Sequence, residues 1–183
     1  MTSLFTERLE LVPMSLSLVE AVMAGDRARA EAAAGVELPA QWPNRALVER
    51  AFYASIELIR GDPERRLWGD RLCIARDGSR KVLGSVVFHG RPEDGIAEVG
   101  YGIEESSQRQ GLATEATGAC VAWALTHDFV HAVRATTFSW HAPSLRVMAK
   151  LGMTQVGAEP HETMGELLTF EIRKARASRT ETE

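Results

Sequence analysis

The chain has 183 residues, of which 45% are hydrophobic and 25% charged. This profile is typical of a globular domain long enough to bury one core. The formal net charge of −4 argues against a nucleic-acid partner held by bulk electrostatics. The first residues lack the basic and apolar regions of a signal peptide, and no apolar run approaches the ~20 residues that span a membrane. We therefore expect a cytoplasmic protein with neither a nucleic-acid nor a membrane partner.

The N-terminal third is predicted to contain one strand followed by helices. Alternating apolar residues that meet Pro13 indicate the strand, and Gly25 separates the first two helices. Asn44 is placed to cap a third helix, whose apolar residues lie along one face. The predicted elements are a strand at Thr6–Val12 and helices at Ser15–Ala24, Asp26–Ala34 and about Arg45–Arg60.

The rest of the chain is predicted to alternate between strands and helices. Turns such as Asp77–Ser79 separate the first three strands, which is typical of an antiparallel meander. The predicted strands are Leu67–Arg76, Lys81–His89, Ile96–Ile103, Ala132–Trp140, Thr154–Ala158 and Leu167–Arg173, and the helices are Thr114–Asp128 and Pro143–Leu151, the latter with Gly152 at the C′ position. This order predicts an α/β fold with a mixed sheet and helices on its faces. We expect a single domain over residues 1–174 and a charged tail over 175–183.

The stretch Gln108–Ala116 has the features of an anion site. It follows a predicted strand and opens a predicted helix, whose first turn has unpaired N–H groups and the positive end of the helix dipole. Gly111 and Ala113 let a phosphate approach the backbone, and Arg109 adds positive charge. The alternative is an ordinary turn between a strand and a helix.

Gln-x-x-Gly-x-Ala in this position resembles the pyrophosphate-binding motif of the GNAT superfamily of acyl-CoA-dependent N-acyltransferases. Four segments are also similar to the RimJ/RimL-like branch, which acetylates the N-termini of ribosomal proteins: Thr6–Leu9, Leu83–Ser85, Ala113–Ala116 and Lys150–Met153. The resemblance implies a mostly antiparallel mixed sheet with two splayed central strands, and acetyl-CoA as the cosubstrate. Homodimers are frequent in this family, so a homodimer is expected.

The resemblance also implies which residues bind acetyl-CoA. The backbone of Val99, Tyr101 and Ile103 would hold the pantetheine arm. The pyrophosphate would bind the loop formed by Gln108, Arg109, Gln110, Gly111, Leu112, Ala113 and Thr114. His141 replaces the Asn of the family's Asn-x-x-Ser motif, and we expect it to take over that contact or to remain an ordinary loop histidine.

Glu98 is the predicted general base, acting directly or through a water. It is a carboxylate within an apolar strand beside the expected thioester, where desolvation is expected to raise its pKa. The alternative is a solvent-facing Glu paired with an arginine. The tyrosine that many family members carry on the following helix is absent, with Met148 near its place. Ser144 matches a serine that is common in the RimJ/RimL-like branch, and this resemblance makes it the predicted donor to the leaving thiolate; the alternative is only a helix-capping hydroxyl.

His89 and Trp140 are expected to line the acceptor pocket. The alternatives are that His89 is a rim residue without a role and that Trp140 is a core residue. The resemblance predicts acetyl transfer to a primary amine in a ternary complex. A peptide or protein α-amine has a pKa near ~8, against ~10.4 for lysine, so a weaker general base is enough to deprotonate it. A small-molecule amine acceptor and a non-catalytic acyl-CoA-binding module are the alternatives. The histidines and the two cysteines, Cys73 and Cys120, lack metal-site spacing, so no metal is expected.

Overall fold

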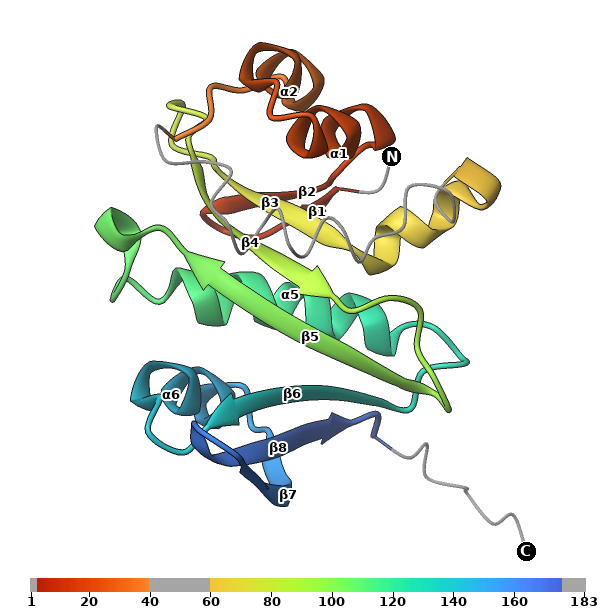
Figure 1. Ribbon diagram of the computed structural model, residues 1–183, viewed down its shortest axis with the longest axis vertical. Coiled ribbons are helices and arrows are strands. Elements are labelled where there is room, and N and C mark those ends of the chain that lie inside the picture. Colours follow the sequence, from red (N-terminus) through yellow and green to blue (C-terminus); the bar gives the residue numbers. More distant parts are fainter. Residues whose placement is uncertain (1–2, 40–59, 176–183) are drawn as a thin grey trace, which may run out of the picture.

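The computed structural model describes residues 3–39 and 60–175. The predicted helix Arg45–Arg60, apart from its last residue, and the predicted tail beyond residue 175 lie outside the described residues. In the part that is described, eight strands form one sheet in the order β1-β2-β3-β4-β5-β6-β8-β7 (Figure 1). The strands are β1 (Leu4–Phe5), β2 (Leu9–Pro13), β3 (Asp70–Ala75), β4 (Val82–Phe88), β5 (Ile96–Ile103), β6 (Ala132–Phe138), β7 (Thr154–His161) and β8 (Gly165–Arg173).

Strand direction follows the chain connections. Neighbouring strands are antiparallel, except that β5 and β6 are parallel. A parallel pair needs a crossover, and the long helix α5 (Leu112–Leu125) supplies it. The predicted mixed and mostly antiparallel sheet is therefore confirmed.

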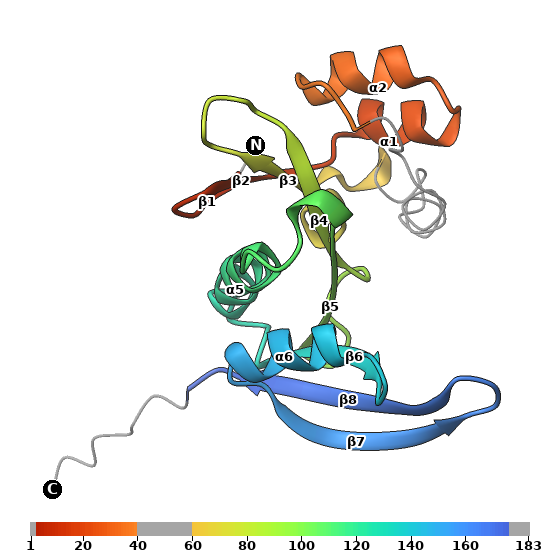
Figure 2. The ribbon, with the colours of Figure 1, turned by 90° about the vertical axis from the view of Figure 1, so that its left-hand side faces the viewer.

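Helices cover both faces of the sheet, as predicted (Figure 2). The helix α5 lies on one face, and α1 (Leu16–Met23) and α2 (Arg27–Ala34) lie on the other. Ser15 accepts a hydrogen bond from the N–H of Leu18 and so caps α1. The described residues also include the helical segments η1 (Pro63–Trp68), η2 (Glu105–Ser107) and α6 (Ala142–Lys150).

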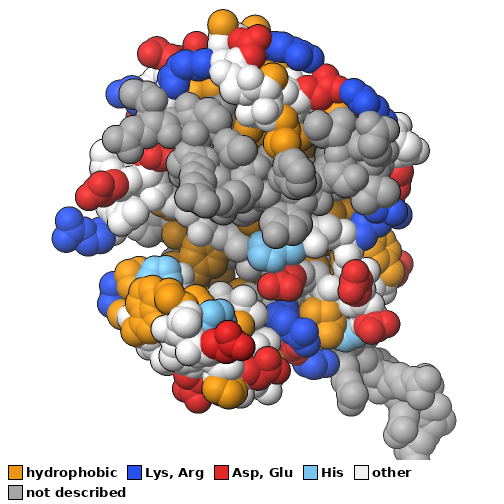
Figure 3. Space-filling model, viewed as in Figure 1, with side chains coloured by type: hydrophobic (Ala, Val, Ile, Leu, Met, Phe, Trp, Pro, Cys, Tyr) orange, Lys and Arg blue, Asp and Glu red, His pale blue; other side chains and the backbone are white. Residues whose placement is uncertain are grey.

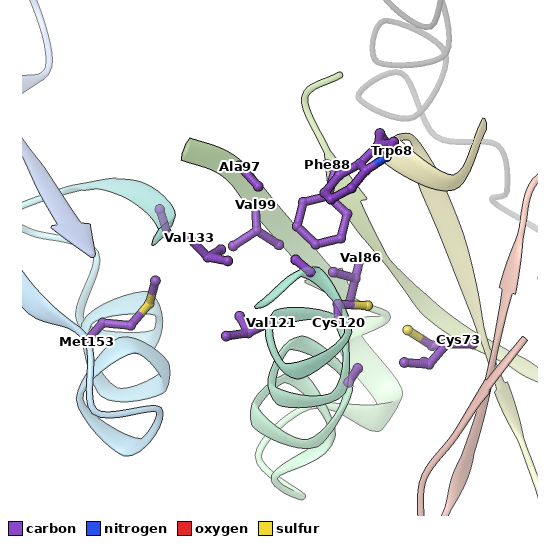
Figure 4. Close-up of a cluster of buried hydrophobic side chains, with 14 of the residues drawn as sticks. Trp68, Cys73, Val86, Phe88, Ala97, Val99, Cys120, Val121, Val133 and Met153 are labelled. Carbon is purple, nitrogen blue, oxygen red and sulfur yellow. The ribbon is translucent and has the colours of Figure 1, made fainter. Parts of the chain in front are cut away.

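Two hydrophobic clusters hold these layers together. The larger one joins α5 and α6 to β5 and β6, and contains Val99, Cys120, Val133 and Met148 (Figure 4 shows the first three). The smaller one packs α1 and α2 against the other face of β2 and β3. Because side chains alternate along a strand, β5 turns its odd-numbered residues toward α5 and its even-numbered residues to the opposite face.

Several predicted boundaries shift by a few residues. The helix α5 begins at Leu112 because Gly111 already has the N-cap position, and β6 ends at Phe138 because a turn begins at Ser139. The C-terminal hairpin is longer than predicted, with its turn confined to residues 162–164. Gly152 has the predicted C′ position after α6, with a left-handed φ of 72°.

Candidate active site

The parallel strands β5 and β6 form a fork. They pair only from Ile96 to Glu98 on β5 and from Ala132 to Arg134 on β6. Beyond these residues the strands diverge toward their C-terminal ends (Figure 1). Figure 3 views the molecule from the side opposite α5 and shows the surface hollowed between the two halves of the sheet. The predicted splay of the two central strands is therefore present.

One edge of this fork presents unpaired backbone groups of β5. The N–H of His89 donates to the carbonyl of Glu98, and the N–H of Glu104 donates to Leu83, so even-numbered residues of β5 bond toward β4. Since backbone groups of successive residues point to opposite edges, the odd-numbered residues point into the fork. Beyond the paired segment these are Val99, Tyr101 and Ile103. A ligand with amide groups can pair with such an edge as another strand would.

The loop that follows β5 has the backbone geometry of an anion site. Arg109 and Gly111 both adopt left-handed conformations, with φ of 60° and 81°. Gly111 provides no side-chain cap to α5, so the N–H groups of the first turn stay available. The side chain of Gln108 donates a hydrogen bond of 2.9 Å to the carbonyl of Ile103 and ties the loop to the end of β5. Left-handed residues that alternate with ordinary ones form concave nests of N–H groups that suit phosphates.

The N-terminal segment anchors this loop through contacts that local sequence patterns do not predict. Glu115, in the first turn of α5, accepts hydrogen bonds from Thr6 Oγ1 at 2.5 Å and Arg8 Nε at 2.7 Å. Arg8 Nη1 also donates to the carbonyl of Gln110 at 2.9 Å. Although burial alone would raise it, the hydrogen bonds from Thr6 and Arg8 hold the pKa of Glu115 below its ordinary value. Arg8 is therefore a positive charge beside the loop at the start of α5.

Glu98 lies at the point where the strands begin to diverge, on the sheet face opposite α5. Its Oε1 is 3.3 Å from His89 Nδ1, and both side chains are roughly half exposed. The hydrogen bond with His89 lowers the pKa of Glu98, and the charges of His89 and Arg134 add to this effect against the opposing effect of burial. The expectation that desolvation raises this pKa is therefore wrong, because partners from neighbouring strands outweigh it.

Arg134 on β6 pairs in register with Glu98 on β5, and Glu171 on β8 fixes its guanidinium group. It donates to Glu171 Oε1 from Nη2 at 2.7 Å and from Nε at 3.1 Å, while Arg173 donates to Glu171 Oε2 at 2.6 Å. The Glu171 side chain is only 2% exposed. One buried carboxylate thus holds two arginines, which leaves positive charge on the Glu98 side of the fork.

Tyr101 and Ser144 meet on the α5 side of the fork. The Tyr101 hydroxyl donates a hydrogen bond of 3.2 Å to the backbone carbonyl of Ser144, in the first turn of α6. Met148, near the place where the family's tyrosine was expected, is 1% exposed and packs in the core. The structure therefore brings a phenol to this helix from β5.

His141 and Trp140 follow β6 at the mouth of the fork. His141 Nδ1 lies 3.3 Å from Thr137 Oγ1, and its side chain is exposed. Trp140 is 59% exposed and donates from Nε1 to the carbonyl of Met164 at 2.9 Å. Its ring stacks on Phe138, which lies on the same face of β6 as Arg134. The alternative of Trp140 as a core residue is thus wrong.

Other kinds of site are not found in the described part of the chain. Its His, Cys, Asp and Glu side chains form no group that could hold a metal ion. The Cys120 thiol is buried, which raises its pKa to about 12, and burial raises the pKa of Cys73 as well. Thiols with such pKa values are poor nucleophiles. No helix in residues 3–39 or 60–175 is both long and apolar enough to cross a membrane.

Comparison with known proteins identifies the fold and family. The family described as "Acetyltransferase (GNAT) domain" matches residues 8–154. The chain belongs to the GNAT acetyltransferase family. The uncharacterized N-acetyltransferase YjdG of Bacillus subtilis is 28% identical over 153 residues, which are 83% of this chain and 89% of that protein.

Two solved GNAT structures share the fold. The ribosomal-protein-S5-alanine acetyltransferase of Vibrio fischeri has a TM-score of 0.65 at 16% identity, covering 96% of this chain and 98% of its own. RimL, a ribosomal L7/L12 α-N-protein acetyltransferase solved with coenzyme A, has a TM-score of 0.63 at 14% identity, covering 94% and 98%. This GNAT protein is an acetyl-CoA-dependent acetyltransferase.

The residues of the fork fit acetyl-CoA chemically. The unpaired edge of Val99, Tyr101 and Ile103 suits the amides of pantetheine. The left-handed residues Arg109 and Gly111 and the uncapped start of α5 suit a pyrophosphate. The β5 edge and the loop before α5 follow each other along the chain, and pantetheine and pyrophosphate follow each other along CoA in the same order.

Proposed function

We propose that this GNAT protein transfers the acetyl group of acetyl-CoA to the α-amine at the N-terminus of a peptide or protein, as a member of the RimJ/RimL-like branch. The observation that carries this proposal is the fork, whose free β5 edge leads from the phosphate loop to a carboxylate at its base. Glu98 thus stands where an amine would meet a thioester held along that edge.

The electrostatics around Glu98 support an α-amine over a lysine. His89 and Arg134 lower the pKa of Glu98, so it is ionised but only weakly basic. An α-amine has a pKa near ~8 and is roughly a tenth neutral at pH 7, whereas a lysine amine with a pKa near ~10.4 is almost fully charged. A weak base removes the proton of the α-amine with far less cost, directly or through a water.

The remaining side chains have supporting roles in this proposal. The backbone of the β5 edge and of residues 108–114 holds acetyl-CoA, with His141 near the pantetheine at the start of α6. The Ser144 hydroxyl supports the leaving thiolate. His89 orients Glu98, and His89 and Trp140 line the side from which the acceptor enters.

Release of CoA from acetyl-CoA tests the proposal. The acceptors to compare are peptides with a free α-amine, peptides whose only amine is a lysine, polyamines, amino acids and aminoglycosides. Release with α-amine peptides that falls at least ~100-fold in Glu98→Gln would support the proposal. Glu10→Gln is the matched control, because Glu10 pairs with Arg80 at the distant β2 strand.

Each other outcome of this assay contradicts part of the proposal. Release only with polyamines, amino acids or aminoglycosides would show a small-molecule acetyltransferase. Tight binding of acetyl-CoA without release on any acceptor would favour a non-catalytic acyl-CoA-binding module. Equal release by the parent and by Glu98→Gln would remove Glu98 from the reaction.

A further inference from the structure

A hydrogen bond joins β5, beyond the residues that pair with β6, to the helix that follows β6. It runs from the phenol of Tyr101, on β5, to the backbone carbonyl of Ser144, in the first turn of α6. The Tyr101 ring packs against the core cluster that contains Val99 and Met148, so the phenol has a fixed direction. The hydroxyl of Tyr101 is therefore held across the gap in which a ligand of the β5 edge would lie.

Tyr101 and Glu98 lie on opposite faces of the sheet. Odd-numbered residues of β5 face α5, and Glu98 faces the other way toward His89. A cosubstrate anchored at the start of α5 enters the fork from the Tyr101 side. An amine that gives its proton to Glu98 enters from the opposite side. The leaving sulfur therefore departs toward Tyr101 and Ser144, while the new C–N bond forms on the Glu98 side.

The leaving thiolate needs a proton donor, and the α5 side of the fork limits the choice. Met148, on the core-facing side of α6, has no proton to give. The hydroxyl of Ser144 can donate a hydrogen bond, but an aliphatic alcohol holds its proton far more tightly than a phenol does. The ordinary pKa of a tyrosine, near ~10, is far closer to that of a thiol, near ~8.5, than the pKa of an aliphatic alcohol is, so a phenol gives its proton to the departing sulfur at a smaller cost.

We propose that Tyr101 is the general acid of this acetyltransferase and donates its phenolic proton to the departing sulfur. This inference rests on the proposed acetyl transfer. As the amine nitrogen bonds to the acetyl carbon and the C–S bond breaks, the sulfur takes up the proton of Tyr101. The proton of the amine passes to Glu98, and solvent returns a proton to the phenolate. The Ser144 carbonyl holds the phenol in place before the transfer.

Burial agrees with this role, because a general acid must stay protonated before it acts. Desolvation of the phenol raises the pKa of Tyr101 above its ordinary value, although the contact with Ser144 opposes the shift. Tyr101 is therefore fully protonated at neutral pH. The carbonyl of Ser144 can only accept, so the Tyr101 hydroxyl is the donor in this contact.

The test is Tyr101→Phe, which keeps the ring and removes the proton. With the acceptor that the parent protein uses, kcat is expected to fall about 100-fold or more while KM for acetyl-CoA stays within about twofold. Ser144→Ala keeps the backbone carbonyl and is expected to lower kcat less than Tyr101→Phe does. A Tyr101→Phe variant with unchanged kcat would overturn the proposal, as would Ser144→Ala with the larger loss.

A binding measurement tests the contact without any acceptor. The parent is expected to bind CoA about 2- to 10-fold tighter than desulfo-CoA, which lacks the sulfur, and Tyr101→Phe is expected to lose this preference. Tight CoA binding by Tyr101→Phe also shows that the variant folds. A preference that persists in the variant contradicts a contact between Tyr101 and sulfur. A parent that binds CoA but acetylates no acceptor contradicts the proposed function instead, so the two failures are distinguishable.

Discussion

Replacement of Gly111 by Ala tests the phosphate loop quantitatively. Gly111 has a φ of 81°, a left-handed conformation that costs a residue with a Cβ about 1–2 kcal/mol. The added Cβ would approach Arg8 Nη2 no closer than 3.6 Å, which is an ordinary contact. The penalty is therefore conformational and not a clash. The variant either keeps the loop and loses about 1–2 kcal/mol of folding free energy, or relaxes the loop and misaligns its N–H groups.

A relaxed loop would weaken CoA binding by a factor that follows from the same penalty. Since 1.4 kcal/mol corresponds to a tenfold change in affinity, a loss of about 1–2 kcal/mol raises Kd about 5- to 30-fold. Calorimetric titration with CoA measures Kd, and thermal unfolding without ligand measures stability. We expect the loss of binding free energy and the loss of unfolding free energy to add up to about 1–2 kcal/mol.

Gly25→Ala is the matched control for this experiment. Gly25 has a φ of 66°, an added Cβ there meets nothing within 4 Å, and it follows α1 on the opposite face of the sheet. Its replacement is expected to cost a similar amount of stability, about 1–2 kcal/mol, and to leave CoA affinity unchanged. A Gly111→Ala variant with unchanged Kd and unchanged stability would contradict a phosphate site at this loop, as would a Gly25→Ala variant that weakened CoA binding as much.

Three further predictions concern charges around the fork. Arg8→Ala is expected to weaken CoA binding several-fold, because it frees the contact to Gln110 and removes a positive charge; an unchanged Kd in calorimetry would exclude this role. The lowered pKa of Glu98 means that this base is ionised at any pH above its ordinary value of 4.5. A profile of kcat/KM against pH should therefore show no loss of activity near neutral pH that comes from protonation of Glu98. A loss near neutral pH that disappears in Glu98→Gln would contradict the lowered pKa of Glu98. Glu171→Gln is expected to cost about 1.5–3 kcal/mol of folding free energy at pH 7, because the carboxylate is buried against two arginines. Because the pKa of Glu171 is lowered, the difference in unfolding free energy between the parent and Glu171→Gln, measured with urea, should shrink as pH falls below 4.5. A difference that grows would contradict the lowered pKa of Glu171.

The sequence predicts the fold well, because the fold follows from local patterns, and the same patterns carry the prediction for the backbone part of the site. Alternation in β5 indicates which of its residues face the core, and the position of Gly111 between a strand and a helix indicates the phosphate loop. These features depend on neighbouring residues in the chain. The boundary shifts at α5 and β6 are small for the same reason.

The electrostatic part of the site depends on pairs that are distant in sequence. Local reasoning about Glu98 considers its apolar strand and expects a raised pKa, but His89, just after β4, and Arg134, on β6, reverse the direction. The contact of Tyr101 with Ser144 spans 43 positions and is equally invisible to local patterns. These pairs depend on strand register and on where α6 lies, which only the folded structure provides.

The anchor between Arg8 and Glu115 shows the same limit. It spans 107 positions, and the only signal in the sequence was that both residues lie in segments that resemble the RimJ/RimL-like branch. The resemblance does not say which side chains of these segments make a contact. Three hydrogen bonds and one ion pair, made to Glu115 by Thr6 and Arg8, give the contact its geometry.

In the proposed complex, acetyl-CoA lies in the fork and pairs with the free edge of β5. Residue-resolved amide hydrogen exchange by NMR, with and without CoA, tests it most directly. We predict that CoA slows exchange at Val99 and Tyr101 and in the first turn of α5. Gly100, whose backbone points toward β4, should change little. Protection confined to the β7–β8 hairpin, or equal protection at Gly100 and Tyr101, would contradict the account.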